Sequence, residues 1–164
     1  MANFHEQSTL NGSVEQVIQV FASQDFAQQL SQRAGAELTS FNIDGDVNGA
    51  FTLTAVRAAG TDRVPDFAKK FVGDKVQVTQ IENWEAPDAN GNRKATVQVQ
   101  VAGAPASISG TETLVANGET TDYTIDGDLN VSIPLVGNKI AAKATPAAGK
   151  VFAVQTQLIN NNLQ

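Results

Sequence analysis

The strongest constraint on the fold is the alternation of residue types between positions 123 and 135. Every second residue from Tyr123 to Leu135 is apolar or glycine, and positions 124 to 132 of the other parity are threonine, aspartate, asparagine or serine. Successive side chains of a β-strand point to opposite faces of the sheet. The segment therefore predicts one long strand with one face toward a core or cavity and the other toward water.

Several earlier segments predict strands that pair with this one. Asn117-Gly118 directly before it is the strongest hairpin signal in the chain, because type I′ turns favour this dipeptide. Other apolar or alternating segments, separated by glycine, aspartate and asparagine, lie at 3–9, 38–43, 51–56, 75–84, 97–101 and 107–115. Together they predict an antiparallel sheet of about seven strands.

Helical signals follow the first strand. Ser13 and Gln16 have the spacing of a capping box, and apolar residues follow on one helical face. We expect Asp25 to start a second short helix, which Gly35 stops.

The C-terminal part of the chain predicts a long helix. Its apolar stripe consists of Ile140, Ala144, Val151, Val154 and Leu158. Pro146 and Gly149 interrupt the stripe, so we expect a kink or restart there, with Thr145 as the cap of the second part.

Composition excludes several classes of function. The chain has 164 residues, about one domain (1–164). It has no cysteine and a single histidine, which excludes disulfides, thiolate zinc sites and multi-histidine metal sites. The net charge is −6 and the pI about 4.6, which opposes binding to nucleic acid or to anionic membranes.

Targeting signals are not evident in the sequence. The first ten residues lack the basic and apolar regions of a signal peptide, and no apolar run approaches the ~20 residues that span a bilayer. We therefore expect a soluble cytoplasmic protein without integral membrane association.

Two segments contain several oxygen-bearing side chains of the kind that bind metal ions. Residues 44–49 fit the start of a calcium loop, D-x-D-x-N-G, but the twelfth position, which needs a bidentate carboxylate, is Ala55. Residues 88–92 also contain aspartate and asparagine side chains that could supply oxygen ligands in series. Aspartate, asparagine and glycine are also what tight turns require, so both are interpreted as turns, and no metal or cofactor is predicted.

Glu112 is the most informative ionisable residue. It shares parity with Ile108 and Leu114, so it points inward beside Tyr123 unless a bulge at Gly110 reverses the parity. An inward glutamate with a tyrosine hydroxyl binds a polar ligand head or acts as a base. Arg57 shares parity with apolar neighbours and is a similar candidate, or a strand-end arginine that reaches water. His5 is expected to be solvated or packed.

The order of elements resembles that of the START-like, or helix-grip, superfamily, in which a curved sheet wraps the last helix. More specifically, the chain is similar to the family called domain of unknown function 2505. The matching stretches are 64–73, the strand of Trp84, 103–105 with 110–112, and 131–140, where Pro134 and Gly137 form the strand-to-helix corner. The resemblance implies an α+β helix-grip fold with a cavity between the sheet and the helix.

Such a cavity predicts a carrier or sensor that binds a hydrophobic or amphipathic small molecule. The sequence does not identify the natural ligand. Segment 61–74 breaks the strand pattern and is interpreted as a short helix or lid. The residues expected to contact the ligand are Phe41, Phe51, Leu53, Phe67, Phe71, Trp84, Val99, Glu112, Tyr123, Ile125, Val154 and Leu158. No catalytic residue is assigned. A cyclase- or hydrolase-like enzyme using Glu112, Tyr123 or Arg57, and a ligand-free interaction module, remain alternatives, and a homodimer is left open.

Overall fold

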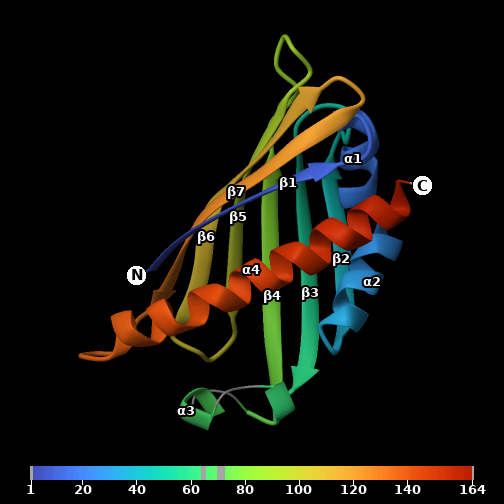
Figure 1. Cartoon of the computed structure of the whole chain (residues 1–164). Coiled ribbons are helices and arrows are strands. Elements are labelled where there is room, and N and C mark those ends of the chain that lie inside the picture. The colour runs from blue at the N-terminus through green and yellow to red at the C-terminus, as the bar shows by residue number, and fades with distance from the viewer. Residues whose placement is uncertain (1, 64–65, 70–72, 164) are drawn as a thin grey trace.

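A computed structural model, which describes residues 2–63, 66–69 and 73–163, has one antiparallel sheet curved around a long helix (Figure 1). The strands have the spatial order β1-β7-β6-β5-β4-β3-β2. They are β1 (Ala2–Leu10), β2 (Ala36–Gly45), β3 (Phe51–Gly60), β4 (Lys75–Trp84), β5 (Arg93–Val101), β6 (Ala106–Asn117) and β7 (Thr120–Val131). The helices are α1 (Val14–Phe21), α2 (Gln24–Arg33), η1 (Thr61–Arg63, a 3-10 turn), α3 (Asp66–Lys69) and α4 (Gly137–Asn162). The predicted α+β helix-grip fold is confirmed.

The two faces of the sheet follow from residue parity. One cross-strand row joins Phe51, Trp84, Ala95, Glu112 and Ile125, and all but the last are buried. Their neighbours along each strand are polar or charged, most often threonine, and occupy the outer face. The register is regular on both sides of Gly110, so no bulge reverses the parity of Glu112.

Serine residues cap both short helices. Ser13 forms the predicted capping box with Gln16. The second helix starts earlier than predicted, because Ser23 and not Asp25 is its cap: the Ser23 hydroxyl accepts from the Phe26 amide at 3.3 Å. Asp25 lies in the first turn instead, where a carboxylate interacts favourably with the helix dipole.

Strand β7 ends at Val131, four residues before the end of the sequence pattern. Pro134 has no amide to donate to a neighbouring strand, and the chain turns into α4. The prediction that Leu135 faces the core was therefore wrong: this side chain is fully exposed.

Helix α4 runs through Pro146 as one helix, so of the predicted kink or restart the restart is wrong. Pro146 cannot donate to the carbonyl of Ala142, but the Thr145 hydroxyl donates to that oxygen at 2.9 Å. Thr145 thus compensates for the missing amide and does not cap a second helix. The predicted stripe is partly wrong, since Val151 is exposed; the buried face carries Gly137, Ala141, Phe152, Leu158 and Ile159. No helix in the described part of the chain is long and apolar enough to cross a membrane.

The segment predicted as a short helix or lid contains η1 and α3 near one end of the sheet (Figure 1). Phe67 lies in α3, but its side chain, like the whole of Phe71, is outside the described residues.

Replacing Pro146 by alanine should stabilise the protein, because it restores one main-chain hydrogen bond to Ala142 and removes a ring from a helix interior. We expect the free energy of unfolding to rise by about 1–3 kcal/mol. Urea denaturation measures the change. Lys143→Ala, an exposed substitution on the same helix, is the control, and a destabilised Pro146→Ala variant would contradict this account.

Candidate functional site

Aromatic side chains fill the inner face at one end of the sheet. Phe21 of α1 lies between Trp84 and Tyr123, with ring centroids 5.4 and 5.7 Å away. Tyr123 also stacks on Phe152 of α4 at 4.9 Å. This end of the space between the sheet and α4 is therefore closed by packed rings.

Glu112 lies on the inner face next to Tyr123, as its parity predicts. Only 2% of its surface is exposed, and its Oε2 accepts a hydrogen bond from the Tyr123 hydroxyl at 2.7 Å. The Tyr123 oxygen accepts in turn from Nε2 of Gln155 at 3.0 Å. A chain of hydrogen bonds thus joins the second half of α4 to the sheet.

A second buried carboxylate, Glu82, was missed in the sequence analysis. It is 1% exposed, and it accepts hydrogen bonds from Trp84 Nε1 at 3.0 Å and from the side chain of Gln80. Its parity, shared with Trp84 and Val76, was the signal that places it on the inner face.

Arg57 extends the hydrogen bonds of Glu82 and Gln80 into a second polar network. Its Nη1 donates to Gln80 Oε1 at 2.8 Å and its Nε to the Ser31 hydroxyl at 2.7 Å. Ser31 is buried and donates onward to the Ala27 carbonyl. Arg57 is partly buried on the inner face, so it is not a strand-end side chain that reaches only into water.

Burial dominates the electrostatics of these groups. It raises the pKa of Glu112 well above the ordinary value, and the charge of Glu82 raises it further, while the Tyr123 hydrogen bond opposes the change. Burial also raises the pKa of Glu82, against the hydrogen bonds of Trp84 and Gln80 and the charge of Arg57. Burial lowers the pKa of Arg57, and the charge of Glu82 opposes this.

The second network lines a narrow inner cleft between the sheet, α1, α2 and α4. Its volume is about 10 Å³, room for roughly one water. The walls combine the polar groups with apolar side chains: Phe21, Phe26, Ala27, Leu30, Phe41, Leu53, Ala55, Arg57, Gln80, Glu82 and Gln155.

Toward the other end of the sheet the inner face changes character. Arg57 pairs with Val78, and Val78 with Val101, while Val99 pairs with Ile108 on the next strand. The inner-face side chains of Val78, Val99, Val101 and Ile108 are partly exposed and together form an apolar strip. Helix α4 packs on β1 and β7, at the edge of the sheet next to this strip.

The predicted ligand contacts therefore fall into separate groups. Phe41 and Leu53 line the inner cleft, and Val99 belongs to the apolar strip. Val154 and Ile125 are partly buried and pack against the core. The remaining described members are buried in the core: Phe51, Trp84, Glu112, Tyr123 and Leu158.

The calcium-like segment forms a turn. Asp46 accepts from the Asn48 amide at 3.0 Å, and the guanidinium of Arg93 donates to the carbonyls of Val47 and Gly49. A cationic side chain thus already binds the loop oxygens. The described residues contain no group of three or more histidine, cysteine, aspartate or glutamate side chains arranged for a metal.

His5 is exposed on the outer face, where it pairs with Asp126 on the neighbouring strand. The partner acid was not identified from the sequence, because the β1–β7 register brings together residues far apart in the chain.

Glu112→Gln should change how stability depends on pH. A raised pKa means that the folded state holds a proton that the unfolded state releases, so wild-type stability is full below the unfolded pKa and falls as pH rises through the folded pKa. Glutamine keeps the acceptor for Tyr123 without the charge. We expect Glu112→Gln to match the wild type near pH 4 and to exceed its stability near pH 8.

Urea denaturation between these pH values tests this, with the exposed Glu119→Gln as control. An identical pH dependence in wild type and Glu112→Gln would contradict the assignment.

Comparisons with known proteins agree with the observed architecture. The sequence profile described as "Protein of unknown function (DUF2505)" matches residues 5–163. No functionally curated protein matches the chain.

Among solved structures, the STAR-related lipid transfer protein from Xanthomonas axonopodis has a TM-score of 0.62 at 13% identity, covering 98% of this chain and 85% of that one. A START superfamily protein from Mycobacterium smegmatis has a TM-score of 0.55 at 13% identity, covering 98% and 96%. Truncated norcoclaurine synthase from Thalictrum flavum has a TM-score of 0.55 at 15% identity, covering 98% and 91%. The chain belongs to the DUF2505 family and has the fold of the START superfamily.

Proposed function

We propose that this protein binds a hydrophobic or amphipathic small molecule against the inner face of the sheet, as a carrier or sensor. The observation that carries the proposal is the apolar strip of Val78, Val99, Val101 and Ile108. These side chains point to the inner side of a curved sheet, yet they remain partly exposed. Covering such surface with an apolar ligand gains about 25 cal/mol for each Å² removed from water.

The polar groups beside the strip indicate the kind of ligand. Arg57 lies next to Val78 in the register and also lines the inner cleft. A ligand with its apolar body on the strip reaches the Arg57 guanidinium with a polar end. A hydrogen-bonded polar end adds specificity to an otherwise apolar contact. The lipid transfer protein with the same fold is consistent with a ligand of this kind.

The enzyme alternative has less support. Glu112 and Tyr123 form the hydrogen-bonded pair that acid–base chemistry needs, and the burial of the glutamate raises its pKa. The Tyr123 ring, however, packs against Phe21 and Phe152, and its hydroxyl oxygen accepts a hydrogen bond from Gln155. Glu112 is only 2% exposed. A substrate would have to displace packed core residues to reach them.

Two neighbouring residues on β5 provide a matched test, because Val99 faces inward and Gln98 outward. Val99→Lys places a charge on the strip and should weaken binding of an apolar fluorescent dye or a long-chain fatty acid by about tenfold or more. Gln98→Lys adds the same charge to the exposed outer face and should leave binding unchanged. Dye fluorescence at a temperature well below melting measures both.

The proposal fails if the wild type binds none of a broad set of apolar molecules, or if both lysine variants bind as the wild type does. Circular dichroism of each variant confirms that a lost signal is not lost folding.

A comparison of a long-chain carboxylic acid with its methyl ester tests the polar end separately. If the polar end lies at Arg57, then Arg57→Gln should weaken binding of a long-chain carboxylic acid by about tenfold, and that of its methyl ester less. Isothermal titration of both ligands measures the difference. Equal losses for acid and ester would place the polar end elsewhere.

A further inference from the structure

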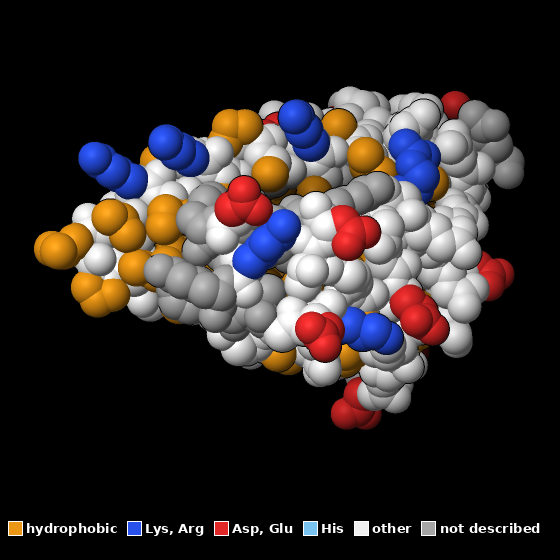
Figure 2. All heavy atoms as spheres, turned by 90° about the horizontal axis from the view of Figure 1, so that it is seen from below, with side chains coloured by type: hydrophobic (Ala, Val, Ile, Leu, Met, Phe, Trp, Pro, Cys, Tyr) orange, Lys and Arg blue, Asp and Glu red, His pale blue; other side chains and the backbone are white. Residues whose placement is uncertain are grey.

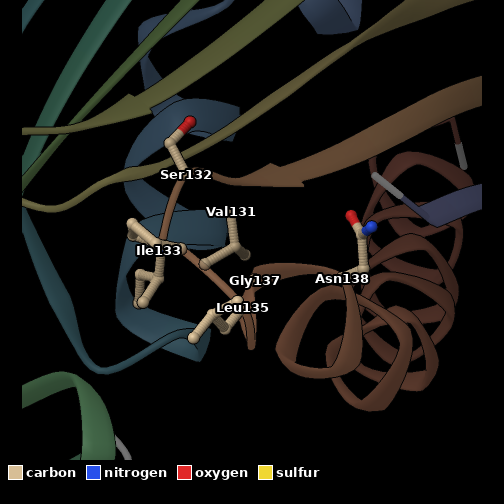
Figure 3. A pocket seen from close by; sticks show the side chains of 7 residues that line it. Val131, Ser132, Ile133, Leu135, Gly137 and Asn138 are labelled. Atoms are coloured by element: carbon tan, nitrogen blue, oxygen red, sulfur yellow. The ribbon is translucent and has the colours of Figure 1, made fainter.

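The corner between β7 and α4 exposes large apolar side chains. Leu135 is 103% exposed and Val136 44%, and Val151 on α4 is 57% exposed. Figure 3 shows the corner from close by: Ile133 and Leu135 point away from α4, beside a surface hollow of about 360 Å³. Apolar surface of this kind is ordinarily covered by a partner or a membrane.

The corner is held in this conformation by its own backbone. The Ser132 amide donates to the Pro105 carbonyl at 2.7 Å, and the Gly137 amide to the Ile133 carbonyl at 2.9 Å. A side chain at Gly137 would collide with the Val131 carbonyl. Leu135 has φ = +74°, the one positive φ of a non-glycine residue in the described part of the chain. An exposed leucine in this unfavourable conformation gains nothing from packing, which points to a use for its side chain outside the fold.

Charge next to the corner is opposite to that of the whole chain. Residues 129–164 contain three lysines and no aspartate or glutamate, although the net charge is −6. Lys139, Lys143 and Lys150 are exposed, and their spacing places them within about 40° of one another around the helix. Ala141 and Phe152 face the sheet from the opposite side of α4.

Figure 2 shows the two features together. Hydrophobic side chains gather at the tip that carries the β7–α4 corner, and basic side chains follow from there along the edge formed by α4. The acidic side chains in this view lie farther from the tip than the first two basic side chains of this edge. The tip thus combines apolar side chains with a row of cations, which the average charge of the chain conceals.

We propose that the β7–α4 corner and the lysine row of α4 form a surface that docks reversibly on anionic lipid bilayers. Leu135 and Val136 enter the interface, and the three lysines meet anionic headgroups. A second copy of the chain fits less well, because two such corners would bring lysine against lysine. The inference does not rest on the ligand-binding proposal, since none of these residues belongs to the apolar strip or the inner cleft.

The pairing of a few apolar side chains with a short basic row predicts weak, salt-sensitive binding. Flotation of the full chain with lipid vesicles tests this prediction. Vesicles of phosphatidylcholine with about one third phosphatidylserine should carry the protein, and vesicles of pure phosphatidylcholine should not. Binding should fall several-fold between roughly 0.05 and 0.5 M salt.

Two variants separate the contributions. Leu135→Asn removes the apolar side chain, and asparagine tolerates a positive φ better than leucine, so the fold is retained; we expect about tenfold weaker binding. Lys139→Glu with Lys143→Glu should weaken binding by about 25-fold, at about fivefold for each lysine lost. Val115→Asn and Lys94→Glu, on exposed strand positions away from the corner, are the matched controls and should bind as the wild type.

The proposal is overturned if the wild type does not float with anionic vesicles at low salt, or if Leu135→Asn binds as tightly as Val115→Asn. It is equally overturned if the double lysine variant binds as the Lys94→Glu control does. The melting temperature of every variant is measured, and only variants that melt like the wild type are compared, so that each comparison is made between folded proteins.

Discussion

Two carboxylates on the inner wall of one sheet have to be accommodated without water, and much of the surrounding arrangement serves this need. Glu112 receives the Tyr123 hydroxyl, which is itself positioned by Gln155. Glu82 receives the Trp84 indole and Gln80. Among the described residues no fully buried side-chain nitrogen or oxygen lacks a hydrogen-bond partner. Leaving one of these carboxylates without its donors would cost more than the bonds themselves contribute.

The same arrangement divides the interior into two parts. Aromatic rings and the two polar networks fill the end of the sheet covered by α1, α2 and the second half of α4. The inner residues of the other end are aliphatic, and they are less completely covered. A fold that is held together at one end by packing and hydrogen bonds can therefore keep apolar surface accessible at the other without losing its core.

Periodicity predicted the strands well, because each has one buried and one exposed face. The inward orientation of Glu112 followed from parity alone. The hydrogen-bond partners of Glu82 did not follow from parity, because the sequence does not reveal which polar side chains of α2, β3 and β4 converge. The end of β7 was misplaced because Ile133 and Leu135 keep the alternation after the hydrogen-bonded ladder stops. At α2, two adequate caps stood two residues apart, and only the backbone geometry distinguishes Ser23 from Asp25.

The hydrogen-bonded chain through Gln155 makes helix α4 uneven along its length. After Pro146 the helix contributes Phe152, Leu158 and Ile159 to the core and is bonded to Tyr123, whereas before it only Gly137 and Ala141 are buried. The proline removes one of the main-chain hydrogen bonds that would couple the two halves. Amide protons of the second half should thus exchange with solvent as slowly as those of the central strands, while those of the first half open in a separate, less costly step. One continuous helix then comprises two units of different local stability.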